Sequence, residues 1–190
     1  MSYANIKITN WGIKIDLQGL IFVAAVTALN FVINTMVIPV APSIWMKFGG
    51  SVGNFVSTCT GPLWATISTM VSVAYVGLLI HGDVAGIFVA GFTGFAIAFF
   101  DKWVPPLVNV GLSSPLTGVV SILQQVFITG SPVALAVQIF MKRIATGVVN
   151  SLVFTLLYSM PGIYRYVPMY YDSWVVRYWL LKIEEEEAED

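Results

Sequence analysis

The chain has 190 residues, of which 57% are apolar and 10% charged, and its formal net charge is −1. A soluble domain of this size carries about 25% charged residues, because polar groups have to cover its whole surface. The composition therefore excludes a soluble domain and predicts a single integral membrane domain over residues 1–190, with the lipid bilayer as its surroundings and no basic surface for nucleic acid.

The chain begins with a polar segment, residues 1–16, which we expect to be cytoplasmic or interfacial. A long apolar helix is predicted over Leu17–Val40, ended by Pro39 and Pro42. This run is longer than the apolar region of a signal peptide, about 7–15 residues, so we expect it to be retained as a membrane span. A loop is predicted over Ala41–Phe48.

Five more helices are predicted, which gives an all-α bundle of about six transmembrane helices over residues 17–162. Gly61 and Pro62 mark a break between a short Gly-rich helix and a longer one, since proline is favoured in a first turn and disfavoured inside a helix. The predicted ranges are Gly49–Cys59, Leu63–Ile80, Val84–Phe100, Leu107–Thr129 with an interruption near Pro115, and Val133–Met160.

Residues 163–190 differ from the rest in composition, because aromatic and basic side chains alternate there before an acidic end. Aromatic and basic side chains prefer the headgroup zone, so we expect this segment to lie at the membrane surface. Basic residues flank the bundle at both ends. An even number of spans then predicts that both termini of this multi-pass protein face the cytoplasm, with the chain in the plasma membrane.

Only seven Lys, Arg, Asp, Glu or His side chains lie between Leu17 and Tyr164. A charge left uncompensated in hydrocarbon costs several kcal/mol, so each of these positions is informative. Lys142 and Arg143 fall inside the helix predicted over Val133–Met160. The other five fall in predicted loops, namely Lys47, His81, Asp83, Asp101 and Lys102.

Arg143 and Asn150 share one face of their predicted helix with Gly147, two turns apart or about 10.5 Å along the axis. Polar groups inside a membrane usually face the bundle interior or a wet cavity. We therefore predict a substrate-binding site in which Arg143, beside Lys142, pairs with an acidic group and Asn150 hydrogen-bonds the solute. The alternative is that this helix begins later, so that the two cations reach the interface.

The helix predicted over Leu107–Thr129 carries a polar stripe of Ser114, Thr117, Ser121 and Gln125, with Gln124 beside it. The two glutamines are expected to face Arg143 and to supply donors and acceptors to the solute. The hydroxyls could equally join helices by hydrogen bonds.

Two loop residues complete the predicted site. Trp45, which is expected at the interface, and His81, which could line an outer mouth, both fall in predicted loops. For His81, which is followed two residues later by Asp83, the alternative is a solvated loop pair.

Small residues recur at a spacing of four, which allows helices to approach closely. Ala24 and Ala28 form such a pair, and Gly49 with Gly53 and Ala90 with Gly94 and Ala98 form others. No nucleophile–base arrangement, phosphate-binding loop or pair of histidines is present. We therefore expect no catalytic residue, no metal site and no cofactor.

Three features carry a family resemblance: Ala24-x-x-x-Ala28, the sequence Gly61-Pro62-Leu63-Trp64, and Arg143 followed by Asn150. Over roughly Leu17–Pro161 the chain resembles the substrate-binding S component of an energy-coupling factor (ECF) vitamin transporter. The resemblance implies six helices with cytoplasmic ends, and a vitamin or precursor bound on the outer side. It also implies that Ala24 and Ala28 face a transmembrane coupling subunit, which works with two ATPase subunits. The alternative is a non-transporting membrane subunit whose small residues form packing seams.

Overall fold

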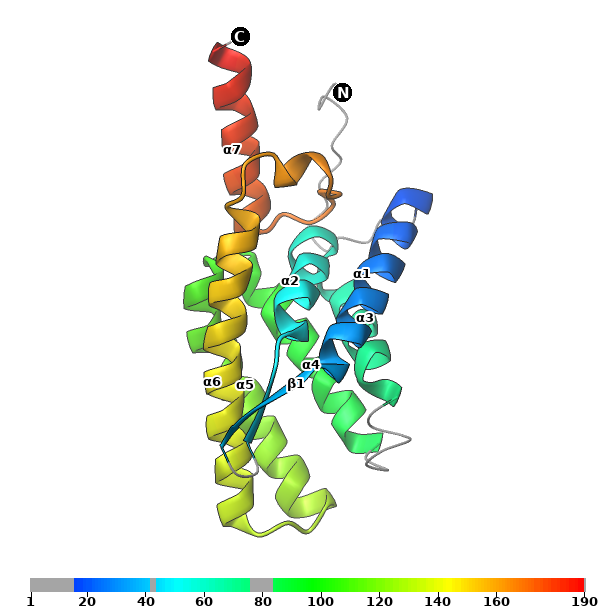
Figure 1. Ribbon diagram of the computed structural model, residues 1–190, viewed down its shortest axis with the longest axis vertical. Helices are drawn as coiled ribbons and strands as arrows, with labels where there is room; N and C mark the ends of the chain where they lie inside the picture. The colour runs from blue at the N-terminus through cyan, green and yellow to red at the C-terminus, as the bar shows by residue number, and fades with distance from the viewer. Residues whose placement is uncertain (1–15, 42–43, 76–83, 190) are drawn as a thin grey trace.

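The computed structural model describes residues 16–41, 44–75 and 84–189, which form a helical bundle with one small hairpin (Figure 1). Among the described helices, α1, α4, α6 and the α5 helix with its extension are long and apolar enough to cross a membrane. A count of six crossings stays a prediction, because α2 and the described part of α3 are shorter. The helices are α1 (Leu17–Thr35), α2 (Gly49–Thr60), α3 (Pro62–Tyr75), α4 (Val84–Asp101), α5 (Pro106–Leu123) with a π-helical extension (Gln124–Ile128), α6 (Val133–Tyr158) and α7 (Trp174–Glu189), with a 3-10 turn at Ile163–Arg165.

The first helix is shorter than predicted and leads into a hairpin. β1 (Val37–Ala41) pairs antiparallel with β2 (Ile44–Lys47), beside the lower half of α6 (Figure 1). Pro39 has no N–H to donate to the carbonyl of Thr35, and it disfavours helical backbone at the residue before it. The predictions of a helix reaching Val40 and of a plain loop over Ala41–Phe48 are therefore wrong.

Two further prolines were expected to break helices, and one of them does. Gly61 has a positive φ of 86° after the end of α2, and α3 begins at Pro62, as predicted. Pro115 instead lies inside a continuous α5. Membrane helices tolerate such a proline because hydroxyls and neighbouring helices satisfy the freed backbone groups.

Small residues allow α3 and α4 to pack closely, in line with the predicted seam. A Cβ added at Gly94 would lie 2.6 Å from the carbonyl oxygen of Ala65, and Ala98 is fully buried. On the other side of α3, the hydroxyls of Thr27 and Ser68 lie 2.7 Å apart and join it to α1. Close backbone approach and a few polar bonds therefore hold these helices together.

We expect Gly94→Ala to destabilise the bundle, because the added methyl group would collide with backbone atoms that cannot move independently. Overpacking of this kind costs about 1–3 kcal/mol. The matched control is Gly111→Ala, because a Cβ at Gly111 meets nothing within 4 Å. Thermal unfolding in detergent should show a lower Tm for Gly94→Ala alone. Equal Tm values for the two variants would contradict a tight α3–α4 seam.

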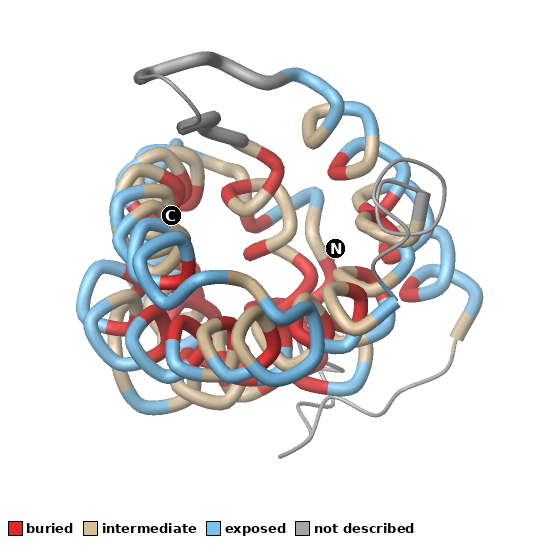
Figure 2. The backbone as a smooth tube through the Cα atoms, turned by 90° about the horizontal axis from the view of Figure 1, so that it is seen from below, coloured by how far each residue is buried: buried red, intermediate tan, exposed pale blue. Residues whose placement is uncertain are grey.

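The outer surface of the bundle is apolar. Leu17, Phe88, Phe127 and Leu156 have exposed fractions of 74%, 64%, 79% and 70%. Figure 2 shows the exposed positions on the outer side of the helices and the buried ones on the inner side. Soluble monomers rarely expose apolar patches of this extent. With the four candidate spans, this surface identifies a membrane protein.

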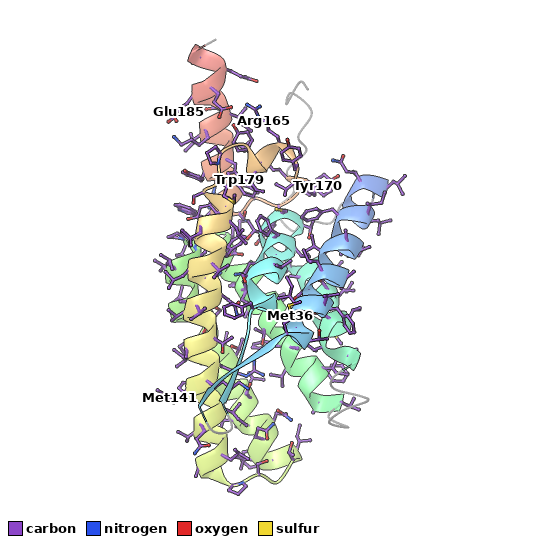
Figure 3. The ribbon with its side chains drawn as sticks, in the orientation of Figure 1. Met36, Met141, Arg165, Tyr170, Trp179 and Glu185 are labelled. Carbon is purple, nitrogen blue, oxygen red and sulfur yellow. The ribbon has the colours of Figure 1, made fainter. Side chains whose placement is uncertain are left out.

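The C-terminal segment packs onto one end of the bundle and forms its most buried aromatic cluster (Figure 3). The indole of Trp179 is 1% exposed, and its Nε1 donates to the carbonyl of Tyr158 at 2.9 Å. The backbone N–H groups of Tyr170 and Tyr171 both donate to the carbonyl of Cys59 at the end of α2. These aromatic rings are thus core residues as well as candidates for the membrane interface, and the interfacial location stays a prediction.

Two tyrosines extend this contact to other helices. The hydroxyl of Tyr170 donates to the carboxylate of Asp16, which also caps α1 by accepting from the N–H of Gly19. Burial and this carboxylate raise the pKa of Tyr170 to about 12. The hydroxyl of Tyr171 donates to the carbonyl of Ala98 in α4 at 3.0 Å. The start of α1 and α7 lie at the same end of the molecule (Figure 1), as an even number of crossings requires.

Candidate functional site

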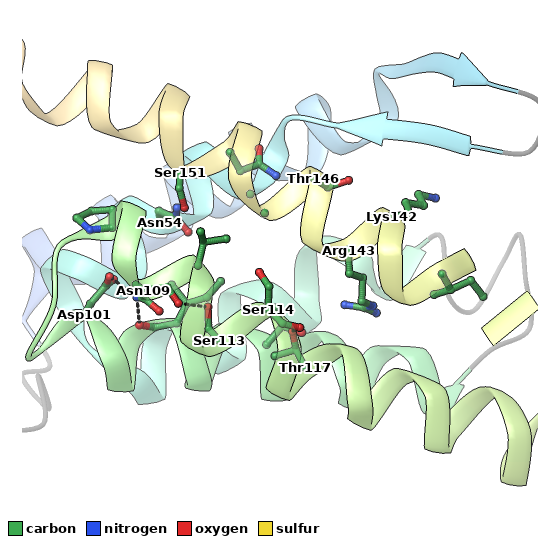
Figure 4. Close-up of a pocket in the computed structure, with 18 residues that line it drawn as sticks. Asn54, Asp101, Asn109, Ser113, Ser114, Thr117, Lys142, Arg143, Thr146 and Ser151 are labelled. Carbon is green, nitrogen blue, oxygen red and sulfur yellow. Dashed lines mark hydrogen bonds between the residues drawn. The ribbon is translucent and has the colours of Figure 1, made fainter. Parts of the chain in front are cut away.

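A cavity of about 340 Å³ lies among α2, α4, α5 and α6 (Figure 4). Its volume falls within the range of small-molecule sites, about 300–1,000 Å³. Amide, hydroxyl and charged side chains supply much of its lining, although the bundle around it is apolar. None of the described lining residues is aromatic.

The cationic end of the cavity is formed by α6. This helix begins at Val133, so a later start does not carry Lys142 and Arg143 to an interface. Both residues line the cavity, and Figure 4 shows the guanidinium of Arg143 between α6 and α5. No described residue forms an ion pair with Arg143. A guanidinium in this position is suited to an anionic group of a bound molecule.

The opposite end is formed by a buried carboxylate. Asp101 is 3% exposed, and its Oδ1 accepts from Asn109 Nδ2 at 2.6 Å. Its Oδ2 accepts from the hydroxyls of Ser57 and Thr58 at 3.2 and 3.0 Å. The prediction that Asp101 lies in a loop is wrong, because these donors from α2 and α5 hold the carboxylate inside, at the last residue of α4.

Two buried polar atoms beside the cavity have no hydrogen-bond partner among the described residues. Asn109 Nδ2 donates to Asp101 and to the carbonyl of Ile97, which fixes the orientation of the amide. Its Oδ1 is then left without a donor, and the hydroxyl of Thr146 is also unpartnered. Buried polar atoms nearly always have partners. Two exceptions beside one cavity make it the candidate site of this bundle.

Asn150 lines the cavity together with Arg143 and Gly147, the face that the helical spacing predicted. Its Oδ1 accepts from the backbone N–H and the hydroxyl of Ser51, at 3.1 and 3.2 Å. Asn150 therefore fixes the start of α2 against α6. Its role in binding a solute stays a prediction, as does that of Lys142.

The two glutamines do not line this cavity. Gln125 Nε2 donates to Gln124 Oε1, Gln124 Nε2 donates to Thr129, and the hydroxyl of Ser131 donates to Gln125. The expectation that they face Arg143 has to be corrected, because the polar stripe leaves the cavity after Thr117, and Ser121, which precedes the glutamines, already does not line it. They close the turn between α5 and α6 instead.

The remaining predicted residues have different outcomes. Trp45 belongs to β2, but its side chain lies outside the described part of the structure, and so does His81 altogether. Ala24 and Ala28 are exposed on the outer face of α1, whereas Val23 is buried. This exposure suits a docking surface, which stays a prediction.

The cavity residues missed from the sequence include Asp101, Asn109 and Thr146. A signal for Asn109 was present, because the polar stripe of α5 extends upstream at spacings of four through Ser113 and Thr117. Composition alone could not show that Asp101 is buried in the cavity, because its neighbour Lys102 made both residues look like part of a charged loop. Among the described residues, no group of three or more His, Cys, Asp or Glu side chains is placed to hold a metal ion.

Comparisons with known proteins identify the fold. No family model matches the sequence, and no curated protein matches it. A solved structure of the S component of a bacterial ECF transporter aligns with a TM-score of 0.61 and 20% sequence identity. The alignment covers 74% of this chain and 93% of that one. The chain therefore has the fold of the S component of a bacterial ECF transporter.

Proposed function

We propose that this chain is the solute-binding S subunit of an ECF-type importer and binds a vitamin or vitamin precursor for uptake. The observation that carries the proposal is the polar cavity between α2, α4, α5 and α6. The guanidinium of Arg143 lies at one end of the cavity, and two unpartnered polar atoms, Asn109 Oδ1 and the Thr146 hydroxyl, lie along its walls. The exterior of the bundle is apolar. Such an arrangement suits binding of a small molecule.

The proposal includes ATPase partners, because this sequence contains no phosphate-binding loop with which to bind ATP itself. A transmembrane coupling subunit and two ATPase subunits would drive release of the solute inward. Ala24 and Ala28, exposed on α1, support this arrangement because their small side chains allow another helix to approach closely.

The proposed function can be tested by identifying what the protein carries. Protein purified in mild detergent should release a small molecule on denaturation, identified by mass spectrometry in near-stoichiometric amount. The same compound, added back to protein washed free of it, should raise the Tm. Absence of any copurified solute, together with an unchanged Tm across a panel of vitamins and precursors, would contradict a binding function.

The docking surface leads to a separate prediction. Replacing Ala24 and Ala28 together with tryptophan should abolish copurification of a coexpressed coupling subunit, because two indoles would hold the helices apart. Solute binding should persist, since both residues face away from the cavity. Leu156→Trp on the exposed face of α6 is the control. If the complex survives the double substitution, or is lost equally in the control, α1 is not the docking surface.

A further inference from the structure

Two hydroxyls in the α5 wall of the cavity can accept hydrogen bonds. The hydroxyl of Ser113 donates to the carbonyl of Asn109, and that of Thr117 donates to the carbonyl of Ser114. Each hydroxyl has one proton and two lone pairs, so its oxygen keeps acceptor capacity after this donation. A molecule lying along α5 therefore meets acceptors and needs donors of its own.

Asp101 strengthens this preference by orienting Asn109. The carboxylate and the carbonyl of Ile97 take both amide hydrogens, which leaves the Oδ1 of a residue that is 2% exposed without a donor. Asp101 is therefore a positioning residue for Asn109, and its two oxygens accept from three protein donors. The amide presents an acceptor at this end of the cavity, opposite the guanidinium of Arg143.

The two ends are separated by the length of a small molecule. Contacts between Gly147 and Ser114 and between Gly118 and Phe140 fix the register of α5 against α6. Arg143 is then level with about Thr117, and Asn109 lies about 10–12 Å away at 1.5 Å per residue. Figure 4 shows Ser113 and Ser114 between these ends.

These observations define the chemistry of the solute. Arg143 requires an anionic group, the α5 wall and Asn109 require N–H or O–H donors, and the absence of aromatic lining among the described residues provides no partner for ring stacking. The geometry points to an aliphatic carboxylate that carries hydroxyl or amide N–H groups along its length and at its far end. This assignment rests on the proposed function.

Four probes test separately whether the solute needs an anionic group, a terminal donor and an aliphatic chain. Each is titrated into solute-free protein and its effect on the Tm is measured. 6-Hydroxyhexanoate has both groups, hexanoate lacks the donor, 1,6-hexanediol lacks the anion, and 4-hydroxybenzoate has both groups on a planar ring. We expect 6-hydroxyhexanoate to bind best, with hexanoate weaker by about 2- to 12-fold, the contribution of one neutral hydrogen bond. The assignment is overturned if hexanoate or 4-hydroxybenzoate binds equally well, or if no probe raises the Tm.

A pair of matched variants on α6 tests the role of the unpartnered hydroxyl. Thr146→Val keeps the shape and removes the hydroxyl, whereas Thr155→Val removes one that already donates to the carbonyl of Ser151. Thr146 lies one turn from Arg143, about 4.5 Å along the helix axis, so its partner would be a hydroxyl near the carboxylate. Thr146→Val alone should therefore reduce the preference for 3-hydroxyhexanoate over hexanoate, with hexanoate affinity unchanged. If the preference stays, or both variants lose it equally, Thr146 does not select for a donor and the assignment fails.

The two proposals fail in different ways. An aromatic vitamin found bound in near-stoichiometric amount would support the proposed function and overturn the solute class. Protein that carries no solute and responds to none would overturn the proposed function itself.

Discussion

Replacing Arg143 with alanine should weaken binding of the copurified solute by about 10- to 150-fold, the contribution of a charge-assisted hydrogen bond of about 1.5–3 kcal/mol. The guanidinium lines the cavity and has no ion-pair partner among the described residues, so the anionic group of the solute is its expected counter-charge. The measurement is the Kd of purified protein by calorimetry, with the Tm of the solute-free variant as a test of folding.

Gln125→Ala is the matched control for this substitution. Gln125 is bonded to Gln124 and Ser131 in the turn after α5 and does not line the cavity, so its loss should leave the Kd unchanged. An unchanged Kd in Arg143→Ala would mean that this cation contacts lipid or a partner instead. A higher Kd in both variants would place the solute nearer the turn between α5 and α6 than the cavity.

Trp179→Ala should destabilise the protein by about 3–5 kcal/mol, as expected for truncation of a fully packed aromatic side chain. The indole is 1% exposed and donates to the carbonyl of Tyr158, so the substitution removes packing and leaves a buried carbonyl without that donor. Unfolding by denaturant in detergent, followed by circular dichroism, measures the change.

The control for Trp179→Ala lies two residues further along α7. Leu181 is 59% exposed, so Leu181→Ala should change the free energy of unfolding by no more than about 0.5 kcal/mol. Equal effects of the two substitutions would show that α7 frays without disturbing the bundle. That result would contradict the inclusion of the C-terminal segment in the core.

Much of the helical plan could be predicted from the sequence, because Gly61, Pro62 and the long apolar runs determine where helices begin and end. The hairpin could not, since Val37, Ile38 and Val40 continue an apolar run that hydropathy does not distinguish from the end of a helix. Pro39 was recognised as the end of a helix, but pairing of two short strands depends on contacts that no local pattern displays.

The candidate site divides in the same way. Arg143 and Asn150 were found because helical periodicity places them on one face of a single helix. The cluster around Asp101 was missed because its donors come from Ser57, Thr58 and Asn109, on two other helices. The glutamines were misplaced because the polar stripe of α5 continues beyond the cavity, whose lining on this helix ends at Thr117.

The bonds from Tyr170 and Tyr171 to Cys59 bear on the order in which the molecule is made. Synthesis runs from the N-terminus, and these partners are separated by more than one hundred positions in the chain. The helices that meet at this end are therefore synthesised before the segment that joins them. Until then the carbonyl at the end of α2 lacks its tyrosine donors, and the aromatic cluster lacks Trp179. The core at this end is thus completed only once that segment is made, and any nascent chain released before Trp174 is incomplete there.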